Sequence, residues 1–185
     1  MLRLLAAAAI GLAALPAVAD EVTDTLDSAL QAYNDGDVDG ARKDLEYATK
    51  LLAAMKAETL AKFLPEALPG WTKAEGDEAE TGGMMAMLGG GTSASATYTK
   101  GSEELTITLV ANSPMVTGIA SMMGGVAAMG NSKPMRIQRT EFVENDEELQ
   151  GVVEGKVLIT VAGGAPVEDK TAYLEKMDFK AIADF

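Results

Sequence analysis

The sequence predicts an α+β protein: an N-terminal helical hairpin, then a mostly antiparallel sheet of about five or six strands with packed helices. Three observations support this fold class. Apolar residues recur at helical spacing in two adjoining segments between Asp20 and Phe63. From Ser93 onward, short segments alternate between apolar and polar residues and are separated by turns. Strands that are joined by short turns and flanked by helices are typical of antiparallel α+β layers.

The first residues have the order of a secretory signal peptide. Arg3 precedes an apolar run from Leu4 to Leu15, and Ala17-Val18-Ala19 supplies the small residues of a cleavage site. The run is too short to span a hydrocarbon core of about 30 Å, so we expect cleavage after Ala19 and no membrane insertion afterwards. The expected organisation is a signal peptide over 1–19, a helical hairpin over 20–64 and an α+β sandwich domain over 65–185. Such a chain is periplasmic or secreted.

Two amphipathic helices are expected in the hairpin, one from Asp20 to Asn34 and one from Val38 to about Phe63. Their apolar stripes are Val22, Leu26, Ala29, Leu30 and Tyr33 in the first helix, and Val38, Ala41, Leu45, Ala48, Leu52 and Met55 in the second. The short turn between the helices predicts an antiparallel pair in which each stripe is buried against the other.

Residues of this hairpin resemble a single tetratricopeptide unit. The packing positions of that repeat correspond to Ala29, Tyr33, Gly36-Asp37, Ala41, Leu45 and Ala48. The resemblance covers about 30 residues and has no second copy. Because one such unit cannot bury its outer faces, we expect it to dock on the following domain, on another protomer or on a partner.

The turn between the helices also matches the pattern of a calcium-binding EF-hand loop. Its ligand positions hold Asp35, Asp37, Asp39 and Glu46, with Gly40 at the glycine position. Asn34, Arg42 and Lys43 depart from the usual pattern, and the match requires the second helix to begin later than its apolar stripe does. A plain acidic turn between two helices is the alternative to a calcium site.

Two connecting segments follow the hairpin. Phe63 to Trp71 contains two prolines and a glycine, so it is not helical, and its apolar residues, Trp71 above all, are expected to pin the chain against a core. Gly76 to Gly91 is acidic and then rich in glycine and methionine, and it reads as an exposed loop. The residues of this loop expected to contact a partner are Met84, Met85, Met87 and Leu88. Because thioether clusters select copper(I), the three methionines are also candidate copper(I) ligands.

The second half of the chain alternates strand and helix signals. Strands are expected over Ser93–Lys100, Leu105–Ala111, Met135–Val143, Leu149–Glu154 and Val157–Ala162, and a closing helix over Thr171–Phe185. Between the second and third strands, Ser113 and Pro114 begin a helix that extends to Gly130. Its stripe is Met115, Ile119, Met122, Val126 and Met129. We expect this stripe to cover the sheet, with the helix's glycines acting as spacing devices for close approach.

The composition excludes several classes of function. With 15 basic and 28 acidic residues, the net charge of −13 repels nucleic acid and anionic lipid surfaces and favours basic partners or cations. The chain has no histidine and no cysteine, so it has no Ser-His-Asp or Cys-His nucleophile system and no ordinary zinc site. We therefore expect a non-enzymatic protein with no required cofactor.

Motifs spread along the chain resemble a group of exported Gram-negative proteins of unknown function. These motifs are LPGW, MMAMLGGGTSAS, YTKG, the SPM helix start and MDFKAI. The order of elements from Trp71 onward also resembles the sandwich of PsbP-type extrinsic proteins, which assist larger membrane complexes. The resemblances imply an accessory role and carry no catalytic or binding residue over to this chain.

Three functions agree with these observations. The first is a binding or scaffold module of the cell envelope that contacts a partner, or a second copy, through the hairpin and the methionine and glycine loop. The second is metal binding, either of copper(I) by Met84, Met85 and Met87 or of calcium by the loop from Asp35 to Glu46. The third is a small-ligand or lipid carrier, which needs a cavity between the methionine helix and the sheet.

Overall fold

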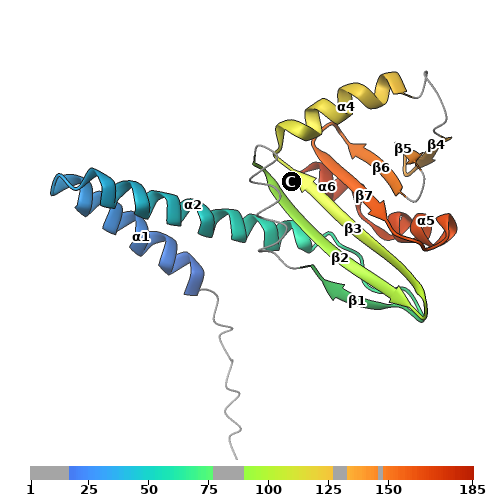
Figure 1. Ribbon diagram of the computed structural model, residues 1–185, viewed down its shortest axis with the longest axis horizontal. Coiled ribbons are helices and arrows are strands. Elements are labelled where there is room, and N and C mark those ends of the chain that lie inside the picture. Colours follow the sequence, from blue (N-terminus) through green and yellow to red (C-terminus); the bar gives the residue numbers. More distant parts are fainter. Residues whose placement is uncertain (1–16, 77–89, 127–132, 146–147) are drawn as a thin grey trace, which may run out of the picture. The chain divides into compact units, whose positions relative to one another are not determined.

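The computed structural model describes residues 17–76, 90–126, 133–145 and 148–185. The chain divides into two compact units, one that ends at Leu52 and one from Ala53 to Phe185. The fold class is α+β, as predicted, with two N-terminal helices before a seven-stranded antiparallel sheet and further helices (Figure 1). No helix in the described ranges is long and apolar enough to cross a membrane.

The first unit is a hairpin of α1 (Ala17–Asn34) and the first part of α2 (Val38–Ala61). Gly36 follows α1 with a φ of +83°, a conformation that glycine adopts without strain. Asp37 then caps α2, because its Oδ1 accepts a hydrogen bond from the backbone N–H of Gly40 at 2.9 Å. The helix α1 begins ahead of the expected cleavage after Ala19, and the rest of the predicted signal peptide lies outside the described residues.

The second unit is built on one sheet in which every neighbouring pair of strands is antiparallel. Its strands are β1 (Thr72–Glu75), β2 (Thr92–Lys100), β3 (Glu103–Ala111), β4 (Lys133–Ile137), β5 (Thr140–Asn145), β6 (Glu148–Val153) and β7 (Val157–Ala162). Their order across the sheet is β1-β2-β3-β7-β6-β5-β4. The alternation along β3 places Leu105, Ile107 and Leu109 on one face, where they are fully buried.

The main core lies on that face of the sheet. Leu60 at the end of α2, Tyr173 of α5 (Val167–Lys176) and Ile182 of α6 (Phe179–Ala183) are fully buried there. Tyr98 Oη donates a hydrogen bond to the carbonyl of Pro65 at 2.6 Å, and the N–H of Leu68 donates to Tyr173 Oη at 3.1 Å. The ring of Trp71 meets Tyr173 edge-on at 5.6 Å. The prediction that residues 63–71 are pinned against a core is therefore confirmed.

The opposite face of the sheet is covered in part by α4 (Pro114–Val126). Val116 is buried against Val110 and Leu158, and Met115 and Ile119 pack beside them. This end of the predicted stripe does cover the sheet, whereas the side chains of Met122, Val126 and Met129 lie outside the described part. The expectation that the glycines act as spacing devices is wrong for Gly118, because a Cβ there would meet no atom within 4 Å.

The sheet has more strands than predicted. The segment expected as one strand from Met135 to Val143 forms two, β4 and β5, because Gln138 and Arg139 turn the chain with φ of 46° and 71°. The turn is held by tertiary contacts: Gln138 Nε2 donates to the carbonyls of Leu174, Glu175 and Met177 at 3.0, 3.1 and 2.9 Å. The short edge strand β1, which pairs with β2, was not predicted.

The expected closing helix over Thr171–Phe185 is two helices, α5 and α6. The helix α5 begins earlier than expected, at Val167 directly after Pro166. It ends at Lys176 because Met177 takes an extended conformation, with ψ of 145°. Asp178 then starts α6, and its Oδ1 accepts a hydrogen bond from the N–H of Ala181 at 3.0 Å.

Candidate docking surface

Large apolar side chains are exposed on the two N-terminal helices. In the part of the chain that the structure describes, every large hydrophobic side chain found exposed belongs to α1 or α2. Seven of them lie in the first unit and are 43–66% exposed. We call six of these seven residues, all except Tyr47, the hairpin face: Leu26, Leu30, Tyr33, Val38, Leu45 and Leu52. Exposed apolar patches of this kind mark interaction sites on soluble domains.

The two helices of the hairpin bury small residues instead. Ala29 of α1 and Ala41 and Ala48 of α2 are buried, together with Val22. Ala41 and Ala48 are seven residues apart, as are Val22 and Ala29, so each pair lies on one line along its helix. We call these four residues the alanine seam. Small side chains let two helices approach closely, which leaves the larger residues beside the seam rather than within it.

The hairpin face lies on one side of the hairpin. Leu26 and Tyr33 follow the seam residues Val22 and Ala29 by four positions, which turns them about 40° past a full turn. Leu45 and Leu52 follow Ala41 and Ala48 by the same step. Because the helices are antiparallel, equal rotations in the same sense bring both sets of side chains to the same side of the pair.

The other side of the hairpin is closed by polar contacts. Tyr47 Oη donates a hydrogen bond to Glu21 Oε1, and Ser28 Oγ donates to Asp44 Oδ2, each at 2.7 Å. Glu21, Ser28 and Tyr47 each precede a seam residue by one position, which rotates them by about 100° away from the hairpin face. The hydrogen bond to Glu21 and the charge of its carboxylate raise the pKa of Tyr47 above its ordinary value. The two sides therefore differ: one carries the six residues of the hairpin face, and the other carries these two hydrogen bonds and the partly exposed ring of Tyr47.

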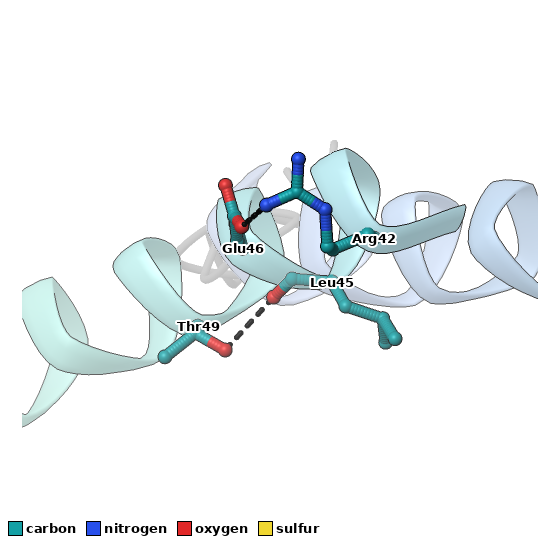
Figure 2. A network of polar contacts seen from close by, with 4 residues as sticks. All are labelled: Arg42, Leu45, Glu46 and Thr49. Carbon is teal, nitrogen blue, oxygen red and sulfur yellow. Dashed lines mark hydrogen bonds and ion pairs between the residues drawn. The ribbon is translucent and has the colours of Figure 1, made fainter. Parts of the chain in front are cut away.

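The first unit is strongly acidic around this surface. Residues 20–52 hold 9 acidic and 3 basic side chains, a net charge of −6. Arg42 forms an ion pair with Glu46 at 2.7 Å, and both side chains are more than half exposed. Figure 2 shows Leu45 pointing away from this ion pair, with its carbonyl accepting a hydrogen bond from Thr49 Oγ1 at 2.8 Å. Leu45 and this ion pair thus point in different directions from α2.

The acidic residues of the turn between α1 and α2 mainly stabilise the start of α2. The carboxylate of Asp37 caps α2, and a Cβ on Gly40 would lie 2.3 Å from Asp37 Oδ2, so a glycine at this position leaves room for the cap. Asp39 lies in the first turn of α2, where the helix dipole favours a negative charge, and Asp35 is exposed in the turn. Glu46 is paired with Arg42.

Within the described ranges, no three His, Cys, Asp or Glu side chains are grouped so that they could hold a metal ion. The residues singled out as calcium ligands are thus placed by the structure without being gathered into a site. The spacing of the Asp and Gly residues is accounted for by capping, and calcium binding here stays a prediction.

The methionine loop lies outside the described residues. Met84, Met85, Met87 and Leu88 fall in the range 77–89, so their roles as partner contacts or copper(I) ligands stay predictions.

The tyrosines of the second unit serve its packing. The rings of Tyr98 and Tyr173 lie 4.4 Å apart, and burial raises the pKa of both hydroxyls. Each hydroxyl is bonded to the backbone of the 65–68 segment. Both groups therefore stay protonated and hold that segment in place.

One small cluster of buried residues packs between the first part of α4 and the sheet. Val116 is buried there against Val110 and Leu158, and two open grooves are lined by residues of both α4 and the sheet. One groove is lined by Arg139, Glu141 and Glu154, among others. Charged side chains at its wall do not suit a lipid tail. The small-ligand or lipid carrier function stays a prediction.

Comparison with known protein families, characterised proteins and solved structures finds no match to this chain. Any function must therefore be argued from the geometry of the molecule.

The residues of the hairpin face belong to the apolar stripes predicted from the sequence, but the side of the helices on which they lie differs from the prediction. The apolar stripes of the two helices were expected to be buried against each other, yet the large members of both stripes are exposed. The sequence signal that distinguishes the buried from the exposed members of the stripes is the seven-residue spacing of the small residues, because this spacing marks a close-packed seam. The expectation that the outer faces of a single hairpin stay unburied agrees with the structure.

Proposed function

We propose that this chain is a non-enzymatic binding or scaffold module of the cell envelope that contacts a protein partner through the hairpin face. The observation that carries the proposal is the one-sided exposure of Leu26, Leu30, Tyr33, Val38, Leu45 and Leu52. The predicted export signal supports the compartment, and the loop with Met84, Met85, Met87 and Leu88 supplies a second contact.

The physical reason is the free energy of leaving these side chains in water. Full burial of a leucine contributes about 1.5–3 kcal/mol, so a face with four leucines, a tyrosine and a valine gains several kcal/mol when a partner covers it. Exposed leucines at this density on one side of a helix pair are typical of helix-mediated association.

The proposal is tested by photo-crosslinking in cells. A photoreactive amino acid is placed at Leu30 or Leu45 in the full chain, and at Tyr47 and Ser102 as controls on the polar side of the hairpin and in the β2–β3 turn. We expect discrete protein adducts from positions 30 and 45, and weaker or no adducts from the controls. A further variant at Met85 asks whether the loop takes part in the contact.

The absence of adducts from both hairpin-face positions, with the chain exported and folded, would overturn the proposal. Equal adducts from all four positions would also count against it, because they would indicate collision rather than a defined surface.

A further inference from the structure

The geometry points to a second copy of this chain as the partner, with two hairpin faces packed together as a four-helix bundle. This inference rests on the proposed use of the hairpin face and names what covers it. Two hairpins related by a two-fold axis parallel to their helices bring each α1 over the α2 of the other copy. All neighbouring helices are then antiparallel, the arrangement of an up-and-down four-helix bundle.

The apolar side chains match in height along this axis. Two inter-helix hydrogen bonds fix the register of the hairpin, because they place Glu21 level with Tyr47 and Ser28 level with Asp44. The same register places Leu45 level with Leu26, and Val38 level with the segment between Leu30 and Tyr33. A two-fold rotation about the helix direction preserves these levels, so Leu26 of one copy meets Leu45 of the other. The hairpin face is thus complementary to itself.

The charges at the edges of the face match as well. Asp27 follows Leu26 and Arg42 follows Ala41, so both lie at the outer edge of the apolar side chains on their helices. By the register above, Asp27 and Arg42 lie at nearly the same level. In the two-fold bundle, Asp27 of one copy therefore lies opposite Arg42 of the other, and the contact occurs twice. The exposed ion pair of Arg42 with Glu46 is weak enough to exchange for it.

The closed arrangement agrees with the two different sides of the hairpin. The side with the Tyr47–Glu21 and Ser28–Asp44 hydrogen bonds remains in water, so pairing of two copies covers the hairpin face on both copies and forms a closed dimer. The like net charge of the two units opposes association over long distances. Added salt screens this repulsion, so the dimer should become tighter as salt increases.

The test is the oligomeric state of the full chain, measured by sedimentation equilibrium after expression with its own N-terminus. We expect a dimer for the natural sequence. The double variant Leu30→Ser/Leu45→Ser should weaken the dimer by roughly 100-fold or more, because two buried leucines are lost from each copy. The matched control is Tyr47→Ser, which removes an exposed aromatic residue from the polar side of the same hairpin and should leave the dimer intact.

A second pair of variants tests the orientation of the copies. Asp27→Arg alone should weaken the dimer by about two- to five-fold, and Asp27→Arg combined with Arg42→Asp should restore it. Far-ultraviolet circular dichroism of each variant confirms that the helices remain. Failure of the double exchange to restore the dimer would overturn this orientation.

A natural chain that stays monomeric at concentrations of about 100 μM would overturn the inference that a second copy covers the face. Dimers that survive Leu30→Ser/Leu45→Ser would do the same. Neither result touches the proposed function, which fails if crosslinks from the hairpin face are absent or no stronger than those from the control positions. If the chain is monomeric and crosslinks to a different protein, the hairpin face is still a docking surface, but its partner is that protein and not a second copy.

Discussion

In the second unit the fully buried side chains are large, among them Tyr98, Ile107 and Phe142. In the hairpin the buried side chains are mainly alanines, and four leucines, Leu26, Leu30, Leu45 and Leu52, are exposed. The second unit therefore buries its apolar side chains to stabilise its own fold. The hairpin uses a small part of its apolar surface for its own packing and leaves the rest available. This difference is the basis of our proposal that the hairpin associates with a partner, whereas the second unit buries its large apolar side chains within its own core.

The largest effect should come from the core of the sheet. Leu109 is fully buried in β3, so Leu109→Ala should destabilise the chain by about 2–5 kcal/mol. Leu30→Ala removes the same atoms from a side chain that is 60% exposed and should change stability by at most about 0.5 kcal/mol in dilute solution. Chemical unfolding measures both values. An equal loss of unfolding free energy in the two variants would contradict the difference in burial between the two regions.

The alanine seam should tolerate no larger side chain. Ala48 is 2% exposed, so Ala48→Leu should overpack the hairpin and destabilise it by about 1–3 kcal/mol. Faster hydrogen exchange of α1 amides reports this loss. Trp71, the only tryptophan, packs in the second unit, so its fluorescence transition should stay unchanged. Unchanged exchange in α1 would show that the seam is looser than described.

The turn between β4 and β5 should depend on one side chain. Gln138 Nε2 donates to three carbonyls at the end of α5, so Gln138→Ala should cost about 1–2 kcal/mol. Its matched control is Gln138→Glu, which keeps the length of the side chain but replaces the donor with acceptors and should be at least as harmful. A stable Gln138→Glu variant in thermal unfolding would contradict the role assigned to this amide.

The smallest effect concerns alkaline pH. Burial raises the pKa of Tyr98 in the folded chain above its ordinary value of about 10. The stabilisation linked to the neutral hydroxyl is therefore complete below pH about 10 and is lost as the pH rises further. Tyr98→Phe should cost about 1 kcal/mol at neutral pH through the lost hydrogen bond to Pro65. Above pH about 10 it should lose stability less steeply than the natural chain; an equal slope would argue against this titration.

The elements that the sequence predicted well are those with strong local signals. Helical periodicity placed α1 and α2, and alternation placed β2, β3, β6 and β7. The turn at Gln138 and Arg139 has no glycine or asparagine, and it is stabilised by carbonyls from α5 that lie far away in the chain. The break at Asp178 was missed because Ala172, Leu174, Met177 and Phe179 read as packing residues of one continuous helix.

The candidate site was harder to predict than the fold. A broad apolar stripe does not say which of its edges faces the neighbouring helix, and larger residues gain more from burial, so the leucines were expected inside. In the structure the alanines form the contact between the two helices, because helices that meet through small side chains approach closely. The leucines are left outside this contact. The acidic turn left two readings open in the sequence, because helix capping and calcium binding both favour Asp and Gly. The structure accounts for Asp37 and Gly40 by capping, and calcium binding stays a prediction.

The most direct measurement of the central claim is the thiol-labelling rate at neighbouring positions of α1. The chain has no cysteine, so Ala29→Cys and Leu30→Cys each introduce a single reactive group. We predict slow labelling of Ala29→Cys at every protein concentration. Leu30→Cys should be labelled rapidly in dilute solution and more slowly as the concentration rises and the hairpin face becomes covered. Labelling of Leu30→Cys as slow as that of Ala29→Cys in dilute solution would contradict the account, because it would place the hairpin face inside the chain.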